Sequence, residues 1–389
     1  MKSLQSRLLT HWFYRGPGTS PPAEPRSHSE HQQDPPQELS AALKVGLLVL
    51  EGVYLTGLAL RELWARLKPP KKVHGVRVVG VGNLVVGGAG KTPCVLAIAQ
   101  SLTKAGWRCG ILSRGYRSQA EHGKPTIIFP EDLAQLPALT VGDEAWWLAW
   151  RTQCPIAVGR DRHSSLNALK AAIPDLNVVI LDDGLQQRYL HCDHTVLVID
   201  ERGFGNGHCL PYGPLREPAI QLTRFTAWVN NGLQIAHPDG LGPLPRLSAP
   251  LTQVGSSWVP LTAWQTPERW LSVGDGIAQL RGRRILAVAG IAKPEQFFQS
   301  LRDMGLAIET LPLADHDPEL ASRIEQQLQL THYDHVLMTE KDAVKFFSTH
   351  TTLPSEAWAL RRDAQCDSEF IQRMMHGPKT PRDLGLSKV

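Results

Sequence analysis

The segment that most constrains the fold of this chain is a glycine-rich turn between an apolar run and a helical pattern. The run at 76–82 reads VRVVGVG, the turn at 83–93 reads NLVVGGAGKTP, and the helical pattern continues to residue 106. Because glycine tolerates backbone conformations that other residues avoid, the amides of the turn can point inward, while the next helix directs its positive end to the same place. This order of features predicts a phosphate-binding loop in a parallel α/β domain.

Apolar runs typical of buried strands recur along the chain, and helical patterns separate several of them. The alternation predicts an α/β fold with a doubly wound parallel sheet, followed by a second, smaller α/β lobe. In the first set the strand-like runs are at 76–82, 109–113, 155–159, 177–183 and 195–200, and the helical patterns are at 93–106 and 163–173. In the second set the strand-like runs are at 283–290, 307–312 and 334–342, and the helical patterns are at 294–305 and 318–329.

The composition is that of a folded protein without a nucleic-acid partner. The 389 residues give room for two or three domains, and 42% hydrophobic with 20% charged residues is ordinary for globular chains. A formal net charge of +4 suits an anionic ligand or a membrane surface, but it is far below a nucleic-acid-binding footprint. The six cysteines are scattered without a C-x-x-C pair, as in a reducing compartment.

The amino-terminal region contains a polar segment and an apolar one. Residues 16–38 are rich in Pro, Ser and His and predict a disordered linker. Residues 45–60 carry one charge, Glu51, and a basic stretch follows them. As a helix they would span about 24 Å, less than the roughly 30 Å of a bilayer core, which favours a helix in the membrane interface; a buried core helix is the alternative. We therefore expect a disordered extension at 1–40, a membrane-associated helix at 41–68, a phosphate-binding domain at 69–230 and a carboxy-terminal α/β lobe at 231–389.

The turn matches the nucleotide phosphate-loop pattern except at its first glycine, where Val85 stands. In this pattern Lys91 would reach the β- and γ-phosphates, and Thr92 would offer its hydroxyl to Mg²⁺. A metal-binding carboxylate is expected at the end of a neighbouring apolar strand. Asp182 and Asp183 end the run NVVILDD, so one of them is expected to face the metal.

Two other nucleotide-binding patterns fail on the residues. In the dinucleotide pattern G-x-G-x-x-G, Gly80 and Gly82 are followed by Val85 where the third glycine belongs. The nearest approach to the GTPase base-recognition sequence is TEKD at 339–342, where the lysine comes one place late. ATP is therefore the expected nucleotide.

Many short blocks in a fixed order resemble the tetraacyldisaccharide 4′-kinase family, from about residue 41 to 346. That family's phosphate loop also lacks the leading glycine. The blocks are VGNLVVGGAGKTP (81–93), LSRGYR (112–117), VGDEA (141–145), LDDGLQ (181–186), GFGN (203–206), LPYGPLREP (210–218), AGIAKPEQFF (289–298), ADH (314–316) and TEKDAVK (339–345).

The resemblance implies a P-loop kinase domain, a second α/β lobe and a membrane-associating amino-terminal helix. It further implies ATP and Mg²⁺ as cofactors, and transfer of the γ-phosphate to the 4′-hydroxyl of a tetraacylated glucosamine disaccharide 1-phosphate, giving lipid IVA in lipid A biosynthesis. The implied location is the cytoplasmic face of a Gram-negative inner membrane, with peripheral or monotopic binding. No protein partner is inferred.

The resemblance also implies roles for individual residues. Asp143 of the VGDEA block would take the 4′-hydroxyl proton, His316 of the ADH block would orient it, and Lys91 would complete the catalytic set. Arg114 and Arg216 are candidate phosphate clamps, since a guanidinium matches phosphate oxygens; a structural ion pair is the alternative for each. The expected nucleotide contacts are Val85, Val86, Gly87, Gly88, Ala89, Gly90, Lys91, Thr92, Arg114 and Arg216, and the expected metal ligands are Thr92, Asp182 and Asp183.

Some positions depart from the family, and other classes of protein stay open. Gln187 stands where the family commonly has a histidine after the aspartates, and the proline-rich insertion at 16–38 is foreign to it. Zinc is not expected at the His and Cys cluster 191–194, because its spacing is incomplete. A tryptophan-rich helix at 146–150 would face the core or lipid. The two alternative functions are a P-loop ATPase or GTPase that acts as a switch, and an inactive scaffold that retains only the fold.

Overall fold

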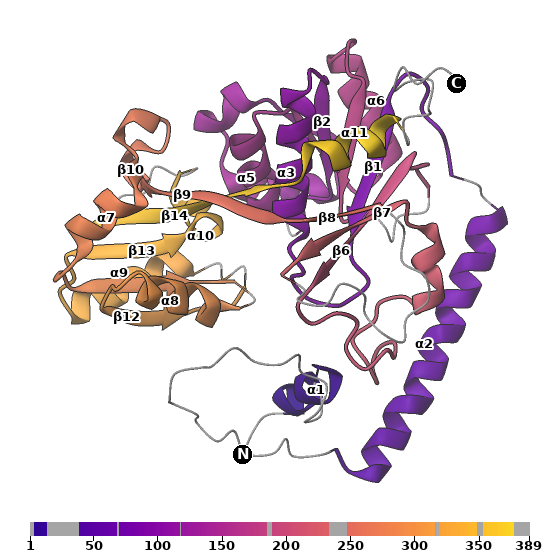
Figure 1. The fold of residues 1–389 in the computed structure, drawn as a ribbon, viewed down its shortest axis with the longest axis horizontal. Helices are drawn as coiled ribbons and strands as arrows, with labels where there is room; N and C mark the ends of the chain where they lie inside the picture. The colour runs from indigo at the N-terminus through magenta and orange to yellow at the C-terminus, as the bar shows by residue number, and fades with distance from the viewer. Residues whose placement is uncertain are drawn as a thin grey trace, which may run out of the picture.

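Two twisted sheets with helices on their faces make up the computed structural model (Figure 1). The structure describes the ten ranges 4–13, 39–67, 70–116, 118–184, 189–232, 247–291, 293–315, 317, 319–347 and 353–376. The first sheet has eight strands and the second has six. This arrangement confirms the expected α/β fold with a second, smaller lobe.

The centre of the first sheet is β1 (Arg77–Gly82), which lies between β5 (Val178–Asp182) and β6 (His194–Asp200) and parallel to both. The order across the sheet is β3-β4-β2-β5-β1-β6-β7-β8, and β3 pairs antiparallel at the edge. All five residues of β5 are buried, as expected of a strand covered on both faces. The other strands are β2 (Cys109–Ser113), β3 (Thr126–Ile128), β4 (Ile156–Val158), β7 (Ala227–Asn231) and β8 (Leu247–Pro250).

Helices cover the first sheet, and local sequence signals fix where they begin. α6 (Arg162–Ala172) begins after Asp161, whose carboxylate accepts hydrogen bonds from the backbone N–H groups of His163 (3.0 Å) and Ser164 (3.4 Å). α3 (Lys91–Lys104) begins after Gly90. The remaining helical segments of this lobe are η1 (Gln119–Glu121), η2 (Pro130–Gln135), α4 (Ala138–Val141), α5 (Asp143–Thr152) and η3 (Ala219–Arg224).

The second sheet combines a parallel core with an antiparallel extension. Its order is β10-β9-β14-β13-β11-β12, in which β11, β12, β13 and β14 run parallel and β9 and β10 are antiparallel. The strands are β9 (Thr252–Pro260), β10 (Leu271–Ser272), β11 (Ile285–Ala289), β12 (Ile308–Pro312), β13 (His335–Thr339) and β14 (Glu356–Gln365). The helical segments of this lobe are η4 (Leu261–Ala263), η5 (Pro267–Arg269), α7 (Val273–Leu280), α8 (Pro294–Asp303), α9 (Leu320–Leu330) and α10 (Glu340–Phe347), and α11 (Ser368–His376) follows β14 at the carboxyl end.

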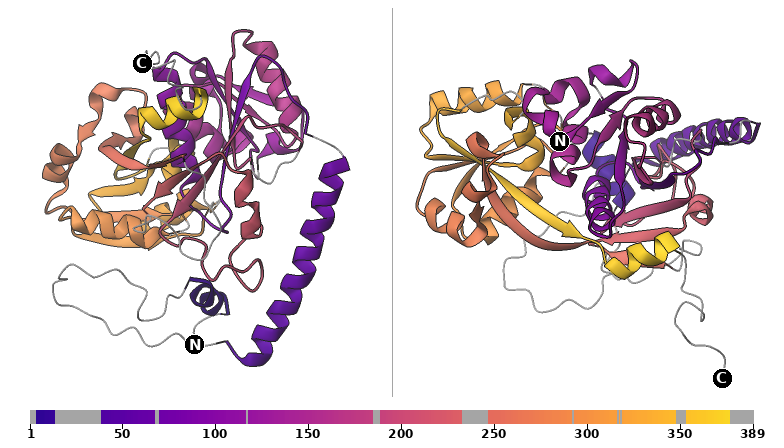
Figure 2. Two further views of the ribbon diagram at one scale, coloured as in Figure 1. Left: turned by 45° about the vertical axis from the view of Figure 1, so that its right-hand side comes forward. Right: turned by 90° about the horizontal axis from the view of Figure 1, so that it is seen from above.

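The long antiparallel pair β9 and β14 connects the two lobes (Figures 1 and 2). β8, at 247–250, still belongs to the first sheet, and α11 at the carboxyl end packs against α3 and β8. Sheet membership therefore places the change of lobe at Leu251 and returns residues 368–376 to the first lobe, which corrects the expected boundary at 231. The sequence missed β8 because LSAP is a short edge strand that ends in proline.

A buried arginine and a group of aromatic rings join the lobes. Arg151, at the end of α5, lies 2.6 Å from both carboxylate oxygens of Glu340 on α10, and it also pairs with Asp363 on β14. Burial raises the pKa of Glu340, and the positive charge of Arg151 opposes that shift. Trp150 packs against Phe347 with ring centroids 5.1 Å apart. The tryptophans of α5 therefore belong to the core, not to a lipid-facing stripe.

α2 (Ala41–Leu67) lies along the outside of the first lobe (Figure 2). Among the described residues it is the one helix that is long and apolar enough to cross a membrane, by length and composition alone. Its 27 residues give a helix of about 40 Å, which is longer than the apolar run by itself suggests. Only Leu47 and Glu51 of this helix are buried, so the alternative of a core helix is wrong.

The expected disorder of residues 1–40 is wrong for the first helix, α1 (Leu4–Phe13). The indole Nε1 of Trp12 donates to the carbonyl oxygen of Pro211 (3.2 Å), and the ring of Phe13 lies 5.2 Å from the guanidinium of Arg202. These aromatic contacts dock α1 on the first lobe. The proline-rich segment 16–38 lies outside the described residues.

Candidate functional site

The phosphate loop has two glycines in a backbone conformation that other residues rarely adopt. Gly87 and Gly90 have positive φ angles of 87° and 83°. A Cβ atom on Gly90 would lie 2.0 Å from Nδ2 of Asn231, and one on Gly87 would lie 3.2 Å from Arg202. Side chains that follow β6 and end β7 thus cover the loop from outside. Backbone conformation favours glycine at positions 87 and 90, and at position 90 the nearby Asn231 leaves no space for a side chain.

Val85, at the position of the missing leading glycine, is held in place by a β-bridge. It pairs antiparallel with Leu215, and the next residue, Val86, donates its N–H to the carbonyl oxygen of Pro214 (2.9 Å). The Val85 side chain is buried in an apolar cluster with Leu84. A side chain is therefore favoured here, because this part of the loop is extended and packed, not turned around a ligand.

Two cations and two polar acceptors meet where the loop joins α3. Nζ of Lys91 lies 3.1 Å from Oδ1 of Asn83 and 3.8 Å from Oδ1 of Asp183. Nη1 of Arg216 lies 3.4 Å from the same Asn83 oxygen and 3.3 Å from the same Asp183 oxygen. Two positive charges thus face the Asp183 carboxylate, and cations at the start of a helix suit an anion.

Asp182 is a buried carboxyl group beside this cluster, at the end of β5. Burial and the nearby charges of Glu144 and Asp183 raise its pKa to about 7, while Lys91 and Arg162 oppose the shift. Its carboxylate accepts no hydrogen bond from any residue that the structure describes. A carboxylate in this environment fits a divalent cation, whose charge would stabilise the ionised form.

Of the three expected metal ligands, Asp182 ends β5 and Asp183 follows it, whereas Thr92 lies in the first turn of α3, which the loop connects to the neighbouring strand β1. Within the described parts of the chain no three or more His, Cys, Asp or Glu side chains gather to hold a metal. Mg²⁺ in phosphate-transferring proteins is commonly held by one or two carboxylates, water and substrate phosphates, so the residues present fit it.

Three further residues of the site were not predicted from the sequence. Arg202 donates to the carbonyl oxygens of Val86 (3.2 Å) and Gly88 (3.0 Å), and Asn231 donates to that of Ala89 (3.1 Å). The third is Asn83, already described. Arg202 and Asn231 stand at the carboxyl ends of β6 and β7. The sequence could indicate only that these strand ends lie near the loop, because parallel strands of one sheet bring their carboxyl ends together, and not that the two side chains bind carbonyl oxygens of the loop.

The remaining predicted residues lie in other surroundings. Arg114 forms an ion pair with Glu121, with Nε 2.7 Å from Oε1, which is the structural alternative foreseen for it. Asp143 is the first residue of α5. His316 and Gln187 lie outside the described residues, so their predicted roles remain predictions.

Ion pairs join the start of α5 to the second lobe. Nζ of Lys341 lies 3.4 Å from Oε1 of Glu144 and 3.1 Å from Oδ1 of Asp315. Lys341 is largely buried, and these two carboxylates raise its pKa against the effect of burial. The block that contains Asp143 and the block that ends at position 316 thus approach each other through one lysine.

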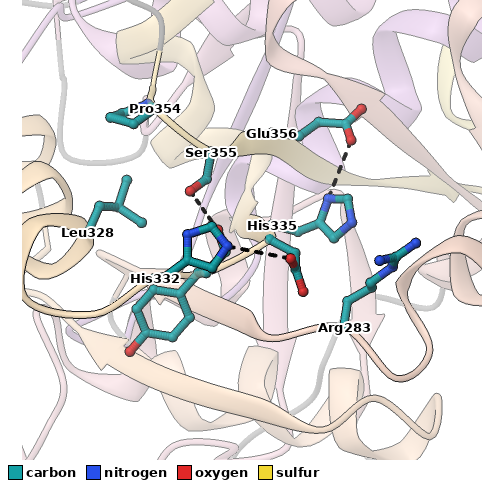
Figure 3. A pocket seen from close by; sticks show the side chains of 9 residues that line it. Arg283, Leu328, His332, His335, Pro354, Ser355 and Glu356 are labelled. Carbon is teal, nitrogen blue, oxygen red and sulfur yellow. Dashed lines mark hydrogen bonds and ion pairs between the residues drawn. The ribbon is translucent and has the colours of Figure 1, made fainter.

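A separate pocket of about 420 Å³ lies in the second lobe (Figure 3). It is at the amino ends of β13 and β14, opposite to the strand ends where parallel α/β sheets bind ligands. Both of its histidines lie near carboxylates: His335 is 3.5 Å from Glu356 and His332 is 3.7 Å from Asp334. The pocket therefore has no part in the phosphate site.

Comparison with known proteins identifies the family. A family model described as tetraacyldisaccharide-1-P 4′-kinase matches residues 43–377. The tetraacyldisaccharide 4′-kinase of Methylibium petroleiphilum is 39% identical over 300 residues, which is 76% of this chain and 78% of that protein. The enzyme of the same name from Dechloromonas aromatica is 38% identical over 325 residues, 84% of this chain and 90% of its own.

One solved structure shows the same fold: LpxK from Aquifex aeolicus, crystallised in complex with ATP. It superposes with a TM-score of 0.68 at 23% identity and covers 86% of this chain and 100% of its own. The family model alone spans well over half of the sequence, and the relatives align across most of their length. The chain belongs to the tetraacyldisaccharide 4′-kinase family.

Proposed function

We propose that this chain transfers the γ-phosphate of ATP to the 4′-hydroxyl of a tetraacylated glucosamine disaccharide 1-phosphate, giving lipid IVA. The observation that carries the proposal is the pair Lys91 and Arg216, which meet at Asn83 and Asp183 beside a glycine-lined loop. Phosphoryl transfer depends mainly on positioning and on neutralising the charge of the transferred group, and this arrangement supplies both.

The residues of the site would divide the work as follows. The N–H groups of the loop and the Lys91 ammonium would bind the β- and γ-phosphates, and Arg216 would stabilise charge on the transferred group. Thr92, Asp182 and Asp183 would hold Mg²⁺, which neutralises phosphate charge when bound. Asp143 would accept the proton of the 4′-hydroxyl, and His316 would orient it.

The ion pairs of Lys341 support this division. They join Glu144, the neighbour of Asp143, to Asp315, the neighbour of position 316. A base on the first lobe and its orienting group on the second would therefore meet when the lobes approach each other.

The exposed apolar face of α2 supports location at the cytoplasmic surface of the inner membrane, where a substrate with four acyl chains resides. A groove of about 350 Å³ between α2 and η3 combines leucine side chains with two arginines, so it would suit acyl chains below a phosphorylated headgroup. Its lining residues are Leu55, Leu58, Ala59, Arg61, Glu62, Leu63, Arg66, Glu217, Pro218 and Gln221.

The direct test is incubation of the protein with γ-labelled ATP and the disaccharide 1-phosphate in mixed micelles, followed by location of the label. We expect label at the 4′ position and almost no release of phosphate without the lipid. Steady ATP hydrolysis without lipid, and no labelled lipid, would instead indicate a nucleotide-driven switch. Nucleotide binding with neither activity would indicate a scaffold.

Gly90→Ala is expected to weaken binding of a non-hydrolysable ATP analogue by about tenfold or more. The alanine would be strained in the left-handed backbone conformation of this position, and its Cβ atom would also clash with Asn231. Gly106→Ala is the matched control, since Gly106 also has a positive φ, 87°, but no atom lies within 4 Å of a Cβ there. Calorimetric titration measures the affinity. Equal affinities for the two variants would show that the loop tolerates a side chain at Gly90.

Replacing Val49, Val53 and Leu60 on the outer face of α2 by serine is expected to lower binding to anionic vesicles by about tenfold or more and to raise the KM for lipid. The three side chains are 62–66% exposed, so the fold should persist. Co-sedimentation measures the effect, and Val254→Ser with Leu330→Ser is a control for exposed apolar residues elsewhere. Unchanged vesicle binding would contradict a membrane role for this face.

A further inference from the structure

α2 carries a buried carboxylate in the middle of an otherwise apolar stretch. Glu51 is 7% exposed, whereas most of the helix faces outward. A buried carboxylate is costly unless it is hydrogen-bonded. Oε1 of Glu51 accepts the backbone N–H of Cys209 at 2.6 Å, and Oε2 lies 3.0 Å from Nδ1 of His208. The Glu51 carboxylate therefore holds the segment of the first lobe that contains His208 and Cys209.

Two more polar side chains on the same side of α2 hold the same segment. The hydroxyl of Tyr54 donates to the carbonyl oxygen of Arg216 at 2.9 Å, and Nη2 of Arg61 lies 2.5 Å from Oε1 of Glu217. Tyr54 is three residues after Glu51, so the two side chains lie on one face of the helix. The helix thus grips the stretch 208–217 at both of its ends.

The stretch 208–217 is held together by backbone hydrogen bonds of its own. The N–H of Leu210 donates to the carbonyl oxygen of Leu215 (3.0 Å), and the N–H of Leu215 donates to that of His208 (3.0 Å). A third bond, from the N–H of Gly213 to the carbonyl oxygen of Cys209 (2.8 Å), closes the turn. A displacement of one end therefore moves the whole stretch.

The other side of this stretch forms one wall of the phosphate loop. Leu215 pairs with Val85, and the N–H of Arg216 donates to the carbonyl oxygen of Leu84 at 2.7 Å. The Arg216 side chain then reaches Asn83 and Asp183. The chain of contacts runs from the outer helix through 208–217 to the cations of the site without a gap.

We propose that Glu51 and Tyr54, assisted by Arg61, are positioning residues of the phosphate site: by fixing the stretch 208–217 they set the place of Arg216 and of the loop at 84–86. α2 then has two functions on two faces, membrane contact outward and site alignment inward. This inference depends on the proposed function in one respect, because it requires that a nucleotide binds in the phosphate loop.

The test compares Glu51→Ala, Glu51→Gln and Tyr54→Phe with Thr56→Ala, an exposed neighbour on α2 whose hydroxyl bonds within the helix, in the full-length protein in detergent micelles. Binding of a fluorescent ATP analogue is measured without lipid, and kcat and the KM values for ATP and lipid are measured with it. We expect Glu51→Ala to weaken analogue binding and raise the KM for ATP by about tenfold, because the Cys209 N–H loses its buried acceptor. Glu51→Gln keeps an acceptor oxygen and should recover most of the loss, whereas Thr56→Ala should bind the analogue normally.

Tyr54→Phe removes one hydroxyl and is expected to remain folded even where Glu51→Ala does not; its analogue affinity should fall about threefold or more. A double variant with Arg216→Ala supplies a second criterion. If Glu51 acts through Arg216 and its loop, the combined loss is smaller than the product of the two single losses.

Wild-type affinity for the analogue in folded Glu51→Ala and Tyr54→Phe proteins, with only the lipid KM changed, would overturn the proposal. The proposal would also be overturned if the loss of affinity in the double variant equalled the product of the losses in Glu51→Ala and Arg216→Ala. A wild-type protein that binds the analogue but labels no lipid would refute the proposed function alone, since the positioning effect is still read in the affinities. A wild-type protein that binds no analogue would refute both.

Discussion

Lys91→Ala is expected to lower kcat/KM for ATP by about 10³-fold, because it removes a charge-assisted contact to the transferred phosphate. In the structure the ammonium faces Asn83 and Asp183 at the first residue of α3. Removal of the Lys91 ammonium leaves Asp183 with Arg216 as its ion-pair partner among the described residues. The site then carries less positive charge, and it fits the phosphate less well. Steady-state kinetics with saturating lipid and calorimetric titration of an ATP analogue measure the two effects.

Lys104→Ala is the control for Lys91→Ala. It removes the same charge from the last turn of the same helix, on an exposed position. Any effect of helix propensity or net charge is therefore common to both variants, and Lys104→Ala should retain activity within about twofold. Activity of Lys91→Ala within tenfold of wild type would show that the loop does not bind the transferred phosphate.

Much of the fold could be predicted from the sequence because its strands are buried on both faces. β1, β2, β5 and β6 read as continuous apolar runs bounded by turns, and the glycine-rich turn fixed the first strand–helix unit. The strands that connect the lobes gave no such signal. β9 is exposed over its first four residues, and β14 carries charged residues in its second half, because each leaves one sheet and approaches the other.

The residues of the candidate site also fall into two groups, those that the sequence indicates and those that it does not. Lys91, Asp182 and Asp183 were predictable because they lie within or directly after a strand–loop–helix pattern. Arg202 and Asn231 were not, because their partners are backbone carbonyls of the loop, and no spacing in the sequence records such a contact. Glu51 was visible as a lone charge in an apolar run, but its role follows from the position of His208 and Cys209, which only the folded chain brings to it.

Asp143→Asn is expected to lower kcat by about 10²–10⁴-fold with little change in affinity for ATP, since the amide has the same shape as the carboxylate but cannot accept the proton of the 4′-hydroxyl. The side chain stands at the start of α5, beside Glu144 and its ion pair to the second lobe. Single-turnover transfer of label to the lipid isolates this step from product release. Analogue binding, measured separately, should match the wild-type protein.

Glu144→Gln separates the chemistry of Asp143 from the electrostatics of its neighbourhood. It too removes one negative charge from the start of α5, and it breaks the contact with Lys341, so it tests lobe alignment and local charge without touching the proposed base. If Asp143 is the base, Glu144→Gln retains activity within about tenfold, because a partly exposed ion pair contributes little by itself. Equal losses of activity in Asp143→Asn and Glu144→Gln would mean that the reaction is limited by negative charge at the start of α5 or by contact between the lobes. The proton of the sugar hydroxyl would then need an acceptor other than Asp143.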